Sequence, residues 1–108
     1  MLGIDLVHIP EFQKQVASGG DTFLKKAFGV LELHNRQPEH LAGLWAAKEA
    51  VVKAGGLNPG EWQDIHISHS ANGAPRARVG TDEYEISIAH HGEYAVAVAQ
   101  KIEKSHDV

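Results

Sequence analysis

The sequence contains no cysteine, which excludes a disulfide framework, a thiolate nucleophile and a cysteine-ligated metal site. It also has no apolar run near the roughly 20 residues that a membrane-spanning helix needs, and Asp5 interrupts the apolar start too early for a secretory signal. The net charge is -4 and no long block of basic residues occurs, which argues against an obligate nucleic-acid or membrane-surface protein. We therefore expect a cytoplasmic protein.

Neither a repeat nor a linker rich in proline or glycine divides the 108 residues, so we expect one domain over residues 1–108. A run rich in Ile, Leu and Val predicts a strand over Leu2–Ile9. Two short helices should follow, separated at the glycine pair of SGGD. A long helix should then begin at Pro38 and end at Gly55 and Gly56.

The second half of the chain consists of short β-type runs separated by turn residues. The runs are WQDIHISHS, APRARV, YEISIAHH and YAVAVAQKI, joined by ANG, GTDE and HGE, and this pattern is typical of an antiparallel meander. The predicted class is therefore α+β. The N-terminal strand should join this antiparallel sheet, and the long helix should lie across its face.

The predicted long helix carries three charged residues among apolar neighbours. On a helical wheel, Glu49 and Lys53 share a face that is otherwise lined with alanine, whereas Lys48 falls inside the apolar arc. One interpretation is an exposed i,i+4 ion pair between Glu49 and Lys53, with Lys48 extending past its apolar neighbours. The other is a shallow face of small residues, suited to a ligand that approaches closely.

Asp5 stands inside the predicted N-terminal strand, where an aspartate must be solvated, paired or bound to a metal. Alone, it is more typical of an edge strand or a bulge. A strand beneath the long helix could, however, bring its carboxylate to that of Glu49. Two hard oxygen ligands suit Mg²⁺, which keeps several waters and commonly bridges to substrate phosphates, so the pair indicates phosphate chemistry.

Histidines are numerous, but they do not form a zinc motif. No H-E-x-x-H occurs, and His66 and His69 are three residues apart on a predicted strand, which should send them to opposite faces. A zinc site is therefore not expected.

Five segments occur in an order that resembles a known family. They are GIDLVHI, FGVLEL, LAGLWAAKEAVVKAGG, NGAPRARV and ISIAHHGEYAVAVA, and together they span nearly the whole chain. On these segments the sequence is similar to the holo-acyl-carrier-protein synthase type of phosphopantetheinyl transferase. The resemblance implies transfer of the 4′-phosphopantetheine arm of coenzyme A to a serine of an apo acyl carrier protein or carrier domain, with release of 3′,5′-adenosine bisphosphate.

The resemblance also implies roles for individual residues. Asp5 and Glu49 would be catalytic residues that hold Mg²⁺, and Lys53 would be a third catalytic residue that stabilises the pyrophosphate charge. The ammonium of Lys48 is expected to emerge toward a bound anion or a neighbouring chain. The implied coenzyme A contacts are Lys48, Lys53, Pro75, Arg76 and His90, and the implied carrier-protein contacts are Lys14, Lys25 and Lys26.

Larger relatives in the family carry two such halves in tandem, so the resemblance implies that this single half forms a homotrimer with sites between subunits. His90 and Pro75 would then serve the site of a neighbouring chain. HISHS is interpreted as a chance match to the family's late serine-histidine motif, which SIAHH fits in position. The chain departs from the family at four positions, His8, Gly29, Leu44 and Ala89, and the segment GTDE is short. A noncatalytic module that binds coenzyme A or a carrier protein is therefore the alternative.

Overall fold

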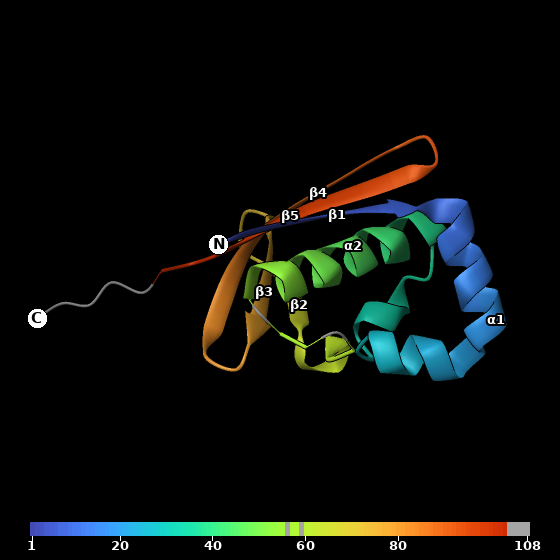
Figure 1. The fold of residues 1–108 in the computed structure, drawn as a ribbon, viewed down its shortest axis with the longest axis horizontal. Coiled ribbons are helices and arrows are strands. Elements are labelled where there is room, and N and C mark those ends of the chain that lie inside the picture. Colours follow the sequence, from blue (N-terminus) through green and yellow to red (C-terminus); the bar gives the residue numbers. More distant parts are fainter. Residues whose placement is uncertain (56, 59, 104–108) are drawn as a thin grey trace, which may run out of the picture.

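A computed structural model describes residues 1–55, 57–58 and 60–103. Within these residues the chain forms five strands, two long helices and two 3₁₀ turns (Figure 1). In chain order these are β1 (Leu2–His8), α1 (Ile9–Ala27), η1 (Glu32–His34), α2 (Pro38–Gly55), η2 (Trp62–Asp64), β2 (His66–His69), β3 (Pro75–Val79), β4 (Asp82–His91) and β5 (Tyr94–Lys101). No helix in the described ranges is long and apolar enough to cross a membrane.

The strands form one sheet in the order β1-β5-β4-β3-β2, and every neighbouring pair is antiparallel. Strands β2 to β5 are the predicted meander, and β1 joins it at the edge by pairing with β5, with Asp5 opposite Ala97. Helix α2 lies across one face of this sheet, against β1, β5 and β4 (Figure 1). The predicted α+β class and the antiparallel sheet beneath a long helix are confirmed.

Small residues let α2 pack closely on the sheet. Ala42, Ala46 and Ala50 are fully buried, and a Cβ at Gly3 of β1 would overlap the carbonyl oxygen of Ala50. Gly3 of β1 therefore packs directly on the backbone of α2. The alanines of the predicted face are buried by the protein itself, so the part of this face open to a ligand is the end that carries Glu49 and Lys53.

The predicted helix boundaries are close to the observed ones. The two short helices predicted after the first strand are both present within α1, and they are divided as predicted at Gly20, whose non-helical backbone has a positive φ of 59° that favours glycine. Strand β1 ends at His8 rather than Ile9. Helix α2 runs from Pro38 to Gly55 as predicted, and Gly56 lies outside the described residues.

The sheet face opposite α2 is apolar along β1. Leu2, Ile4 and Leu6 expose 62%, 59% and 64% of their surface. Their cross-strand neighbours on β5 include Val96 and Val98, which are half-buried. These five residues, here called the outer apolar face, are uncovered in the single chain.

Candidate functional site

Asp5 lies in the middle of β1, on the side of the strand that faces α2. Its carboxylate is 17% exposed, and its Oδ1 atom lies 2.9 Å from the Nζ atom of Lys53 in the last turn of α2. Lys53 also donates to the carbonyl oxygen of Ile4 at 3.0 Å and remains half exposed. The edge strand thus presents an aspartate that is paired with a lysine and still reaches solvent.

Glu49 lies one turn before Lys53 on α2. Its Oε1 atom accepts a hydrogen bond of 2.8 Å from the indole Nε1–H of Trp62. Burial raises the pKa of Glu49, the hydrogen bond from Trp62 opposes this rise, and the charge of Asp5 adds to it. The carboxylates of Asp5 and Glu49 therefore lie near enough to repel each other. Because Lys53 pairs with Asp5, the interpretation of Glu49 and Lys53 as an exposed ion pair is wrong.

Lys48 is fully buried. Its Nζ atom donates to the carbonyl oxygens of Ala27 at 2.9 Å and Trp62 at 3.2 Å, and lies 2.7 Å from Oε1 of Glu32. Burial lowers the pKa of Lys48, and the hydrogen bond and charge of Glu32 oppose that change. The expectation that this ammonium emerges toward an anion or another chain is wrong, because the end of α1 and the turns η1 and η2 surround it. A contact with coenzyme A would require this network to open.

Glu32 is the acceptor around which this buried network forms. Besides Lys48, its carboxylate accepts hydrogen bonds from the backbone N–H of Gly29 at 2.7 Å and of Ile67 at 3.3 Å. It therefore ties η1 and the start of β2 to helix α2. The contact with Gly29 has the i,i+3 spacing of a capping-box glutamate, which is a local signal in the sequence. The partnership with Lys48 has no such signal.

His90 lies on the opposite side of α2 from Glu49. A groove of about 340 Å³ is lined by Leu44 of α2, His69 of β2 and His90 of β4, among others. Leu44 and Glu49 are five residues apart on α2, which places them about 140° apart around the helix. Within one chain, Lys53 beside Asp5 and His90 beside Leu44 therefore lie on different sides of α2.

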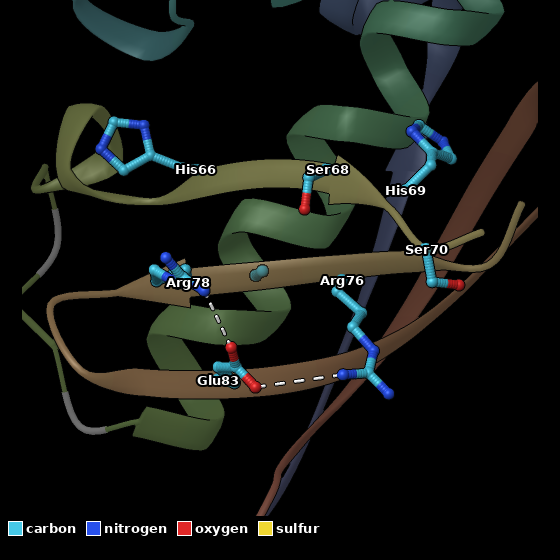
Figure 2. A pocket seen from close by; sticks show the side chains of 8 residues that line it. His66, Ser68, His69, Ser70, Arg76, Arg78 and Glu83 are labelled. Carbon is cyan, nitrogen blue, oxygen red and sulfur yellow. Dashed lines mark hydrogen bonds and ion pairs between the residues drawn. The ribbon is translucent and has the colours of Figure 1, made fainter.

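Arg76 lies on the outer side of β3, in a second groove of about 530 Å³ (Figure 2). Its guanidinium lies 3.9 Å from Glu83 of β4, which also pairs with Arg78 at 3.0 Å. His66 and His69 both line this groove. His69 also lines the groove with Leu44 and His90 on the α2 side, which His66 does not, so the expected alternation of the two histidines along β2 agrees with the register.

Two further sets of predicted contacts reach the surface: Pro75, predicted for coenzyme A, and the three lysines predicted for a carrier protein. Pro75 begins β3 and is half-buried, while Lys14 is exposed on α1 and Lys25 and Lys26 are exposed in its last turn.

The donor set of the acidic site fits a hard divalent cation. Asp5 and Glu49 offer carboxylate oxygens, and their mutual repulsion is only partly relieved by Lys53. In the described ranges, no cluster of three or more histidine, aspartate or glutamate side chains forms a fuller metal cage. Two carboxylates suit Mg²⁺ better than a caged ion, because Mg²⁺ keeps waters and takes further oxygens from substrate phosphates.

Comparisons with known proteins agree with the motif order. Residues 1–99 match the family model of the 4′-phosphopantetheinyl transferase superfamily. The chain is 34% identical to a holo-[acyl-carrier-protein] synthase of Corynebacterium efficiens, over 90% of this chain and 89% of that one. It is 35% identical to the enzyme of that name from Gloeobacter violaceus, over 94% and 91%.

A solved structure extends the likeness to three dimensions. The holo-[acyl-carrier-protein] synthase of Helicobacter pylori, solved in complex with coenzyme A, matches with a TM-score of 0.83 and 30% identity. The match covers 94% of this chain and 100% of that one. The match in sequence and the match in fold agree, and this chain belongs to the 4′-phosphopantetheinyl transferase superfamily.

Proposed function

We propose that this protein transfers the 4′-phosphopantetheine arm of coenzyme A to a serine hydroxyl of an apo carrier protein. The serine oxygen forms a bond to the β-phosphorus, the bond from that phosphorus to the bridging oxygen breaks, and 3′,5′-adenosine bisphosphate leaves. The serine proton passes to solvent. The observation that carries the proposal is that Asp5 of β1 contacts Lys53 of α2 and that Glu49, one turn before Lys53, has its pKa raised in part by the charge of Asp5, in a member of this superfamily.

Asp5 and Glu49 are the proposed ligands of Mg²⁺, which when bound neutralises phosphate charge and aligns the reacting oxygens. Lys53 extends from the last turn of α2 and is half exposed, so its ammonium can exchange Asp5 for a pyrophosphate oxygen. It then stabilises charge on the leaving group. Pro75, Arg76 and His90 remain proposed contacts to coenzyme A.

The proposed active unit is a homotrimer with sites between subunits. Its support is the division of the coenzyme residues by α2, because Glu49 and His90 face away from each other in one chain. In an assembly, the surface of one chain that carries His90 would face the surface of the next chain that carries Glu49. The outer apolar face also needs a cover, since a contiguous exposed apolar surface is typical of an interface.

Leu6→Asp is expected to convert the assembly to monomers, because it puts a charge into the outer apolar face. Sedimentation velocity should then give the mass of one chain, and transfer activity should be lost with the trimer. Ala17→Glu, on the exposed side of α1, is the matched control and should leave the trimer intact. A trimeric Leu6→Asp protein would contradict the proposed interface.

Lys14, Lys25 and Lys26 are proposed to receive an acidic carrier protein by long-range attraction. Exposed charges of this kind mainly accelerate encounter, and salt screens them over about 10 Å at 0.1 M. The KM for the carrier should therefore rise with ionic strength, and the triple Lys→Gln variant should lose most of that dependence. An equal salt dependence in the variant and the wild type would exclude these lysines.

The direct test is mass spectrometry of apo carriers incubated with the protein, Mg²⁺ and coenzyme A. Addition of one phosphopantetheine group is expected, and it should require Mg²⁺. A panel should include free acyl carrier proteins and carrier domains of multidomain synthases. If no carrier gains this mass although carriers bind, the chain is the noncatalytic module instead.

One domain over residues 1–108 and a cytoplasmic location stay predictions.

A further inference from the structure

Trp62 connects the buried lysine network to the acidic site. Its carbonyl oxygen accepts from Nζ of Lys48 at 3.2 Å and from the backbone N–H of Ile65 at 3.1 Å. Its ring packs on Trp45, with 4.9 Å between the ring centroids. Its indole Nε1–H donates to Oε1 of Glu49 at 2.8 Å. The backbone, the ring face and the polar edge of Trp62 are therefore all held.

This arrangement restrains one oxygen of each acidic side chain. Oε1 of Glu49 is bound by Trp62, and Oδ1 of Asp5 is bound by Lys53. Within the described residues, no hydrogen bond or ion pair engages Oε2 of Glu49 or Oδ2 of Asp5. Each carboxylate thus offers one oxygen to a cation, and a partner outside the ligand shell fixes its rotation, which is how such partners tune metal sites.

We propose that Trp62 is a positioning residue for Glu49: its indole N–H fixes the glutamate so that Oε2 is directed to the Mg²⁺ and coenzyme A site. Lys48 contributes by holding the backbone of Trp62, which gives this buried lysine a task that needs no contact with substrate. The inference rests on the proposed function, since it assigns Glu49 to the metal.

The alternative is that Trp62, the first residue of η2, only fills space between η2 and the helices α1 and α2. Its ring lies beside Trp45 in an aromatic cluster that includes Phe12, Phe23 and Phe28, so apolar packing alone explains an aromatic residue here. It does not explain the direction of the indole edge. Phenylalanine preserves most of the packing and removes the donor, so Trp62→Phe separates the two roles.

Trp62→Phe is expected to weaken Mg²⁺-dependent binding of coenzyme A by about 10- to 100-fold, the usual effect of removing a partner of a metal ligand. Isothermal titration calorimetry with coenzyme A, with and without Mg²⁺, measures this without catalysis. The value of kcat should fall by a similar factor while the KM for the carrier is unchanged. Trp45→Phe is the matched control, because Trp45 packs on the same ring and does not bond to Glu49.

The outcomes separate the inference from the proposed function. Trp62→Phe protein that binds coenzyme A and Mg²⁺ as tightly as wild type overturns the positioning role, even if wild type transfers normally. A wild type without transfer activity refutes the proposed function, and the calorimetric comparison still decides the role of Trp62.

Fluorescence gives a second measurement, needed if Trp62→Phe fails to fold. The chain has two tryptophans, so Trp62 is the sole tryptophan in the Trp45→Phe variant and can be excited selectively over tyrosine. Its emission should change on titration with Mg²⁺ and coenzyme A, and the change should vanish when Glu49→Gln is added. If the emission of the Trp45→Phe variant does not change when Mg²⁺ and coenzyme A are added, the inference is wrong.

Discussion

Replacing Glu49 with glutamine is expected to reduce phosphopantetheine transfer at least about a thousandfold, because a bound metal contributes several kcal/mol of transition-state stabilisation. The amide oxygen of glutamine can still accept the hydrogen bond from Trp62, which in the wild type is 2.8 Å long. The substitution therefore removes the charge and leaves the local packing unchanged. Single-turnover assays with a saturating carrier measure the loss, and circular dichroism checks the fold.

The matched control is Glu103→Gln, which removes the same charge at an exposed position beyond β5. It should retain wild-type turnover. Glu49→Gln protein that keeps more than about a tenth of the wild-type rate would mean that Glu49 does not hold the metal. The alternative noncatalytic module gives a different result, since carrier binding would be equal in both proteins and wild type would have no turnover.

The sequence was most informative where chemistry and periodicity coincide. Asp5 is an unfavourable residue inside a strand, and Glu49 and Lys53 are charges on a helix with few polar neighbours, so each stands out locally. The structure then brings the three together through the pairing of β1 with β5 and the close packing of Gly3 on α2. That closeness depends on small residues, whose role the helical wheel could not assign.

Lys48 was harder to predict because all its partners are distant in sequence. Ala27 lies 21 residues before it and Trp62 lies 14 residues after it, and both offer backbone carbonyls, which have no sequence signature. Glu32 lies in FGVLEL, one of the segments that carry the family resemblance, but nothing in that segment indicates Lys48 as its partner. A wheel shows that a lysine points into an apolar arc, but not whether loops will close over its ammonium.

Helix α2 separates the acidic residues from the groove that contains His90, and the sequence did not predict this separation. Acidic residues face one side of it, and the groove of Leu44, His69 and His90 lies on the other. A ligand that needs both sets of residues is best served by two chains. The proposed assembly is thus supported by the position of side chains around one helix as well as by the outer apolar face.

The ion pair between Lys48 and Glu32 gives the second large prediction. Lys48→Met is expected to lower the free energy of unfolding by about 3–5 kcal/mol, because it leaves the nearly buried carboxylate of Glu32 without its cation. Glu32→Gln should cost a similar amount for the converse reason. Urea unfolding at one fixed protein concentration measures both, since stability also depends on assembly.

The double variant, Lys48→Met with Glu32→Gln, should be more stable than the sum of the two single losses predicts, because neither charge is then left buried alone. Lys53→Met is the control at an exposed lysine, and its loss of the pair with Asp5 should cost less than about 1 kcal/mol. Additive losses in the double variant would mean that the bonds from Lys48 to the carbonyls of Ala27 and Trp62 stabilise the fold independently of Glu32. In that case the loop around Trp62 would depend on Lys48 alone, and Glu32→Gln should leave coenzyme A binding unchanged.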